Sequence, residues 1–265
     1  MTEIHSIAGA PLIAGTAPRM PIVWCALIAA ALLSTALSWF AADRLARTVR
    51  TQADEKASSD PYAFSQLNAE LIRVNSRDSG ARYATLGGVT GLMFAAFGLA
   101  LGRKPVTGVI GLVAGLAVGG AVGWGAVQVI YPWFYEMERN PPDAQIQKIF
   151  LGHWAMWGGA GLAAGLGYAL ALGRYKSLPK TILGGVLGVG VAGLLYELII
   201  PMLFPTLPDA SHALPEDFTA RLIIWIAVPL STAVGMGVAL SIGTASSSPT
   251  ANPASNPESA PSSSA

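Results

Sequence analysis

The chain has 265 residues, of which 52% are hydrophobic and only 12% are charged. Soluble domains carry about 25% charged residues, so this composition indicates an integral membrane protein. The formal net charge of +1 excludes the strongly basic surface that nucleic-acid binding needs. Cys25 has no second cysteine to pair with, and His5, His153 and His212 do not form a metal-binding spacing. We therefore expect neither a metal nor a cofactor.

Six stretches are long and apolar enough to cross a bilayer, which takes about 20 residues for roughly 30 Å of hydrocarbon. The sequence therefore predicts an all-α integral membrane protein with about six transmembrane helices. The first stretch exceeds the apolar region of a signal peptide, about 7–15 residues, so we interpret it as an uncleaved anchor, a cleaved signal being the alternative. The predicted spans are 21–42, 82–102, 106–131, 149–173, 181–204 and 222–243.

The segments between and beyond these spans are predicted to lie outside the bilayer. The last of them is rich in Ser, Pro and Ala and has little to bury, so we expect it to be disordered. These segments are an N-terminal tail at 1–20, loops at 43–81, 136–148 and 206–221, and a C-terminal tail at 244–265.

The long loop at 43–81 is predicted to contain one amphipathic helix. Asp60 can cap this helix and Pro61 suits its first position. The side chains on its apolar face favour a helix on the bilayer surface or on the bundle, and the alternative is a docking face for a partner. That face consists of Phe64, Leu67, Leu71 and Val74.

Two predicted helical hairpins, 82–135 and 149–205, resemble each other. The segments 82–103 and 153–174 align without gaps at a spacing of 71 residues, and both end in Leu-Ala-Leu-Gly-Arg. In the second helix of each hairpin, Gln128 corresponds to Glu197 at a spacing of 69 residues. A two-helix unit keeps both copies in the same orientation, as in parallel transporter repeats, although a structural bundle can grow by the same duplication.

Small residues recur every four positions in the predicted helices. This spacing lets helix backbones approach closely in lipid, where burial of apolar surface does not drive association. We therefore predict a Gly/Ala-zipper packed bundle, with a pore or sliding interface as the alternative. The predicted packing positions are Gly111, Gly115, Gly119, Gly123, Gly161, Gly165, Gly173, Gly184, Gly188 and Gly235.

Polar residues inside the predicted spans are the candidates for function. Glu197, with Gln128 at the equivalent point, is a candidate ion or proton site, although a carboxylate near the interface that reaches the headgroups or pairs with a neighbour is favoured. Arg82 and His153 each begin a predicted span and are interpreted as interfacial anchors. Pro229 interrupts the last span, and nearby hydroxyls are expected to satisfy the kink rather than help bind an ion.

The charge distribution gives an orientation. Basic residues in the links inside the hairpins favour the cytoplasmic side for those links. They are Arg103 and Lys104 in the first link and Arg174, Lys176 and Lys180 in the second. Arginines directly after the first span, such as Arg44, oppose this orientation. The expected location is the bacterial inner membrane.

No nucleotide-binding, metalloprotease or serine-hydrolase motif is present, so we do not expect an enzyme. The favoured function is a structural or accessory membrane component, which contacts the lipid bilayer and associates with itself or with a larger membrane complex. The alternative is a small channel or transporter for an ion or small solute that uses Glu197.

Overall fold

The computed structural model describes residues 19–57, 64–102, 104–139, 146–203 and 218–245, and this described part of the chain is all-helical. Each of its six α-helices contains a stretch long and apolar enough to cross a membrane, which indicates a multi-pass integral membrane protein. A helix suits a bilayer because it satisfies its own backbone hydrogen bonds. The elements are α1 Met20–Ala57, α2 Phe64–Leu101, α3 Pro105–Arg139, α4 Ile146–Leu172, the 3-10 turn η1 Tyr175–Ser177, α5 Leu178–Leu203 and α6 Phe218–Ala245.

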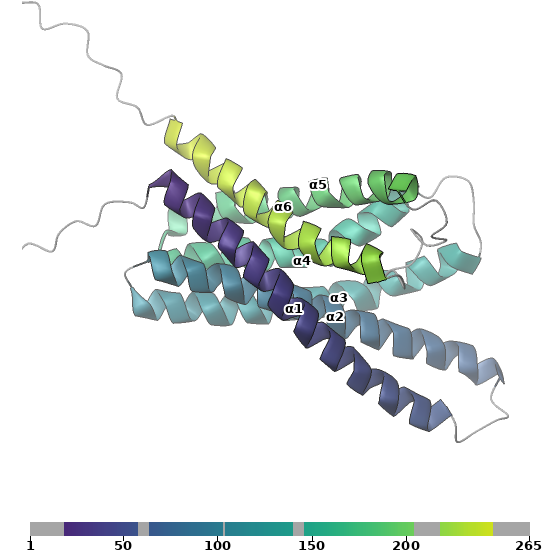
Figure 1. Ribbon diagram of the computed structural model, residues 1–265. Helices are drawn as coiled ribbons and strands as arrows, with labels where there is room; N and C mark the ends of the chain where they lie inside the picture. The colour runs from purple at the N-terminus through teal and green to yellow at the C-terminus, as the bar shows by residue number, and fades with distance from the viewer. Residues whose placement is uncertain (1–18, 58–63, 103, 140–145, 204–217, 246–265) are drawn as a thin grey trace, which may run out of the picture.

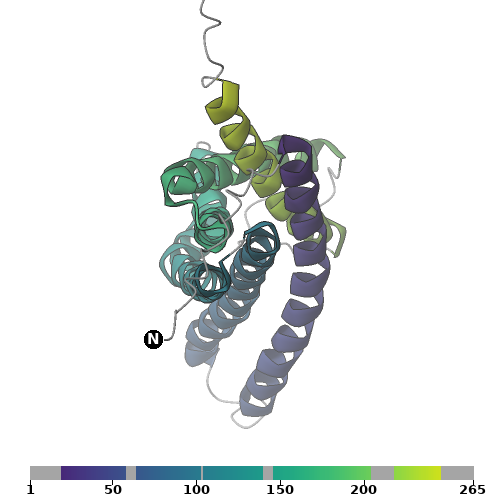
Figure 2. The same ribbon diagram turned by 90° about the vertical axis from the view of Figure 1, so that its left-hand side faces the viewer.

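The helices form two antiparallel hairpins, α2–α3 and α4–α5, with α1 and α6 lying obliquely across one face of them (Figure 1). The view turned by 90° shows α1 on the outside of the bundle, well apart from α3 (Figure 2). Helix α4 is the central element because it contacts α2, α3, α5 and α6. Accordingly, 67% of its apolar stretch is buried inside the protein, a larger share than in any other described span.

The two ends of the bundle differ in the segments that they gather. At one end lie the start of α1, the short connections from α2 to α3 and from α4 to α5, and the end of α6 (Figure 1). We call it the link end. The opposite end, where α3 and α5 finish and α4 and α6 begin, is called the open end. The basic connections lie at the link end, and the polar residues described below lie toward the open end.

Neighbouring helices approach until their backbones touch. A Cβ atom added to Gly115 of α3 would lie 2.5 Å from the carbonyl oxygen of Gly91 in α2. Real side-chain atoms do not come this close, so the contact requires the absence of a side chain. The same kind of backbone contact occurs at the remaining predicted packing positions other than Gly173, namely Gly111, Gly119, Gly123, Gly161, Gly165, Gly184, Gly188 and Gly235.

Gly173 has a different place in the structure, at the end of α4. Its φ angle is +70°, a left-handed conformation that glycine adopts without steric cost. The amide of Gly173 donates to the carbonyl of Leu170 at 3.0 Å, and the amide of Arg174 donates to that of Ala169 at 3.1 Å. This pair of hydrogen bonds is a Schellman motif, so Gly173 ends the helix, a role that the sequence prediction did not assign to it.

The first two helices are longer than predicted. Helix α1 continues to Ala57, and α2 begins at Phe64 and runs without a break to Leu101. The predicted loop at 43–81 with a separate amphipathic helix is therefore wrong in its boundaries, because that helix is the beginning of α2. No proline or glycine interrupts the chain between Phe64 and Ser79, so nothing stops the helix before the span. Asp60 and Pro61 lie outside the described residues.

Candidate functional site

His153 of α4 and Glu197 of α5 form a buried pair near the open end. Nδ1 of the imidazole and Oε1 of the carboxylate share a hydrogen bond, although 44 residues separate them in the sequence. They meet because α4 and α5 run antiparallel in close contact. Only 1% of the His153 side chain and 7% of the Glu197 side chain are exposed. Glu197 thus has a protein partner, which is one of the two options, headgroups or a neighbouring side chain, that the favoured interpretation left open.

Aromatic rings enclose His153 on several sides. The Trp157 ring stacks on the imidazole at 5.1 Å between centroids, with 16° between the ring planes. Phe134 of α3 lies at 5.1 Å, and Tyr196 presents its ring edge-on at 6.1 Å. His153 and Trp157 occupy one face of α4 because they are four residues apart. The rings keep the pair in an apolar setting, where electrostatic attraction is stronger than in water.

Tyr83 of α2 joins this cluster to the first hairpin. The indole Nε1 of Trp157 donates a hydrogen bond to the Tyr83 hydroxyl at 3.3 Å. Both side chains are almost fully buried, with exposures of 1% and 2%. We call His153, Glu197, Trp157, Tyr196 and Tyr83 the histidine–glutamate cluster. Its hydrogen bonds connect α2, α4 and α5, so it fixes the two hairpins relative to each other at the open end.

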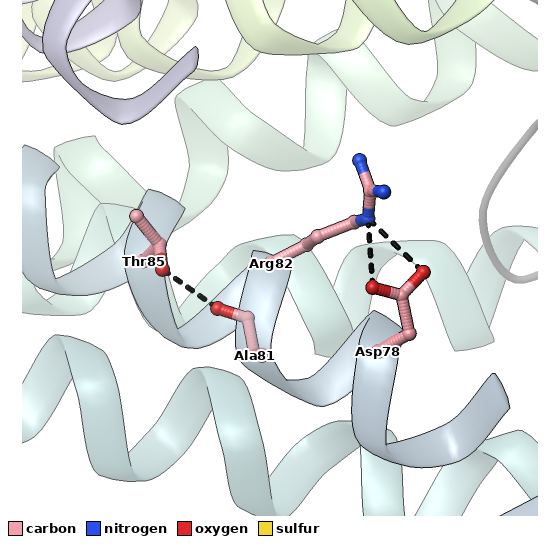
Figure 3. A network of polar contacts seen from close by, with 4 residues as sticks. All are labelled: Asp78, Ala81, Arg82 and Thr85. Atoms are coloured by element: carbon pink, nitrogen blue, oxygen red, sulfur yellow. Dashed lines mark hydrogen bonds and ion pairs between the residues drawn. The ribbon is translucent and has the colours of Figure 1, made fainter. Parts of the chain in front are cut away.

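An ion pair lies next to Tyr83 on α2, between Arg82, which directly precedes it, and Asp78, one turn before Arg82. Arg82 Nε donates to both carboxylate oxygens of Asp78, at 3.2 and 3.3 Å, as Figure 3 shows. In the same view, the Thr85 hydroxyl donates to the carbonyl of Ala81 at 2.7 Å. Both charged residues are buried, with Asp78 at 6% and Arg82 at 8% exposure.

The prediction that Arg82 and His153 stand at the starts of their helices is therefore wrong. Helix α2 begins at Phe64 and α4 begins at Ile146, so both residues lie well inside their helices. Each is buried against protein and paired with a carboxylate. The apolar windows began later than the helices do, because the early parts of α2 and α4 carry charged residues, such as Arg73, Arg77 and Lys148, that lower the local hydropathy.

Gln128 is not brought to Glu197. It lies on α3, where its Oε1 accepts a hydrogen bond from the Ser76 hydroxyl at 3.0 Å and its Nε2 donates to the Ser76 carbonyl at 3.3 Å. Gln128 thus joins α3 to α2, whereas Glu197 joins α5 to α4. The two corresponding positions form separate polar contacts within their own hairpins.

Pro229 lies inside α6, and a residue of another helix contacts the carbonyl that the proline leaves without a hydrogen bond. Proline has no amide hydrogen, so the carbonyl of Trp225, four residues earlier, loses its helical donor. The Thr35 hydroxyl of α1 lies 3.0 Å from this carbonyl and also 3.0 Å from the carbonyl of Ala31 in its own helix, so the two carbonyls share its one hydrogen. Ser231 and Thr232 instead donate to the carbonyl of Val228, at 3.0 and 2.8 Å. The nearby hydroxyls, which the sequence expected to satisfy the kink, therefore do not reach the freed carbonyl, and its side-chain donor comes from α1.

The arrangement limits the chemistry that the site can support. Among the described residues, no group of three or more His, Cys, Asp or Glu side chains could hold a metal ion. One imidazole and one carboxylate can share a proton, and as a buried pair they hold α4 against α5.

Sequence reasoning missed most of the histidine–glutamate cluster. Trp157 and Tyr83 were not singled out, and His153 was assigned another role. The available signal was the pair of rings at His153 and Trp157, four residues apart on one helical face. The partner could not be found in this way, because Glu197 lies on a different helix. Comparisons with protein-family models, with curated proteins and with solved structures find no significant match for this chain.

Proposed function

We propose that the chain is a structural or accessory membrane component, a compact helical bundle that associates with itself or with a larger membrane complex. The observation that carries this proposal is the enclosure of Glu197. Its carboxylate binds His153, with 7% of the side chain exposed, and aromatic rings surround the imidazole. A transport site needs access from water, whereas these contacts hold two helices together.

The bundle is proposed to be a Gly/Ala zipper. Backbone contacts between α2 and α3, between α4 and α5 and between α5 and α6 support this proposal. A Cβ atom at Gly161 would lie 2.5 Å from the carbonyl oxygen of Gly185, and one at Gly184 would lie 2.6 Å from that of Gly235. Such contacts suit a protein whose helices keep fixed positions, because every shift would create steric clashes or voids.

The two hairpins are proposed to be copies of one ancestral unit. Gly87 lies against Gly119 in the first hairpin, and Gly161 lies against Gly185 in the second. Adding the repeat spacings of 71 and 69 residues moves the first contact to positions 158 and 188. The observed contact lies three residues later on α4 and three residues earlier on α5, so it belongs to the same antiparallel register. A shared register supports duplication, and duplication extends a structural bundle without requiring a transported substrate.

The second candidate is a small channel or transporter. It is favoured by one observation, the placement of two ionisable side chains, His153 and Glu197, within the predicted spans. Against it, the groove that lies between α5 and α6 is lined by Tyr196 but not by Glu197. The proposed location for either function is the bacterial inner membrane, with the basic link end in the cytoplasm.

Cross-linking mass spectrometry on native membranes, combined with a liposome flux assay, tests the proposal. A structural component is expected to give stoichiometric cross-links to itself or to one membrane complex. Liposomes that contain wild-type protein should then show the same cation and proton flux as liposomes that contain the Glu197→Gln variant. Flux in the wild type that the variant abolishes would establish the transporter and contradict the structural function.

A further inference from the structure

An apolar groove follows the outer face of α5 and α6. Its volume is about 850 Å³, within the range of about 300–1,000 Å³ that is typical of ligand-binding pockets. It extends along α5 from Lys180 to Ile199, a distance of about 29 Å at 1.5 Å per residue. That length matches the roughly 30 Å of hydrocarbon in a bilayer. The groove therefore has the dimensions of a surface that faces lipid chains across the membrane.

The groove has one charged end. Among the described residues that line it, Lys180, in the first turn of α5, is the only charged one. Arg174 and Lys176 lie in the connection just before α5, and all three cations are exposed. In the described segments of the link end, at 19–30, 95–102, 104–112, 168–182 and 238–245, no Asp or Glu is present to balance them. The amides that begin α5 add the positive end of the helix dipole.

We propose that this groove binds an anionic phospholipid, with the phosphate at Lys180 and the acyl chains between α5 and α6. The apolar half next to Lys180 includes Leu183, Leu187 and Val234, which are at least half exposed. A lipid phosphate lies at the level where a helix leaves the hydrocarbon, which is the level of Lys180. The acyl chains cover the leucines and the valine, and the negative charge balances the basic link.

A second copy of the chain fits this groove less well. Copies inserted in the same orientation place their link ends on the same side of the membrane. A helix of the second copy would therefore bring further cations, such as its own Lys104 and Lys176, toward Lys180. Like charges repel, whereas an anionic lipid neutralises the end. This inference does not depend on the proposed structural function, because a channel with the same groove would bind the same lipid.

The test is native mass spectrometry of the delipidated full-length protein in detergent, titrated with phosphatidylglycerol or with phosphatidylcholine of identical acyl chains. Phosphatidylglycerol is expected to bind more tightly. Lys180→Ala should weaken its binding by about fivefold, the effect of one basic residue near a lipid headgroup. Lys104→Ala, which removes an exposed cation of the other link, is the matched control and should change binding much less.

A second pair of variants tests the apolar part of the site. Val234→Trp places a large ring in the groove and should displace the lipid chain, whereas Val113→Trp adds the same ring on an exposed face of α3, outside the groove. Equal binding of the two lipids, or equal losses in the Lys180 and Lys104 variants, would overturn the proposal. Displacement of the lipid by inorganic phosphate alone would also overturn it, as would a dimer that only Val234→Trp dissociates.

Discussion

At the scale of single residues, His153 and Glu197 show how two polar side chains are accommodated inside the bundle, since each is the other's hydrogen-bond partner. Transferring a charged group into an apolar interior is costly unless the group is paired and hydrogen-bonded. The two side chains satisfy each other, and the stacked Trp157 ring holds the imidazole in position. The pair therefore favours one alignment of α4 and α5, because a shift of either helix by one turn would separate the imidazole from the carboxylate.

This alignment predicts a marked asymmetry between single and double substitutions. His153→Phe keeps a ring beside Trp157 but leaves the Glu197 carboxylate buried without its partner, so we expect it to lower stability by about 3–5 kcal/mol. The double variant His153→Phe with Glu197→Met replaces both groups by apolar ones and should recover most of that loss. Reversible unfolding in mixed micelles measures both variants. A double variant that is less stable than either single variant would contradict the prediction.

At the scale of helices, close backbone contact governs the packing of the hairpins. A Cβ atom at Gly119 of α3 would collide with the carbonyl oxygen of Gly87 in α2, whereas one at Gly125 of the same helix would meet no atom within 4 Å. Both glycines thus lie inside α3, but a side chain fits at Gly125 and does not fit at Gly119. Alanine substitutions at these two positions therefore separate the effect of backbone contact from the effect of helix propensity.

We expect Gly119→Ala to destabilise the bundle because the added methyl group forces α2 and α3 apart, and an overpacked core typically loses about 1–3 kcal/mol. Gly125→Ala should be neutral or slightly stabilising, since alanine favours a helix by about 1 kcal/mol relative to glycine. The melting temperature in detergent and the elution volume on a sizing column measure both effects. Equal melting temperatures for the two variants would contradict the role of backbone contact.

The helices also show what the sequence could and could not predict. The apolar windows located all six spans because the hydropathy of a span depends only on local composition. They did not find the early part of α2, before residue 82, where charged residues such as Arg73, Arg77 and Asp78 lower the hydropathy. The four-residue spacing that drew attention to Gly173 was misleading, because a glycine at the end of an apolar run is also a helix-ending signal.

At the scale of the whole molecule, the contacts that join the layers come from residues far apart in the sequence. The hydrogen bond from Thr35 to the carbonyl of Trp225 spans 190 residues and connects α1 to α6. From the adjacent position on α1, the hydroxyl of Ser34 lies 2.7 Å from that of Thr90 and connects α1 to α2. No sequence pattern encodes such pairs, which is why the sequence predicted the hydroxyls near Pro229 but not the one from α1.

The attachment of α1 to α6 should depend on the Thr35 hydroxyl. Thr35→Val keeps the shape of the side chain but leaves the Trp225 carbonyl without its donor, so stability should fall by about 1–3 kcal/mol. Thr35→Ser keeps the hydroxyl and should retain most of the stability. Thr107→Val, which removes an exposed hydroxyl that bonds only within its own helix turn, is the control and should be neutral. Denaturant titration in detergent compares the variants, and a stable Thr35→Val protein would show that this bond is dispensable.

The central position of α4 has a consequence for biogenesis. Its span is the most buried of the six and also has the lowest mean hydropathy, because it carries His153 and many glycines and alanines in place of large apolar side chains. Such a segment partitions into lipid less readily than its neighbours when it leaves the translocation machinery without other helices beside it. The helix that the other helices surround is thus the one that most needs them to be present before it enters the membrane.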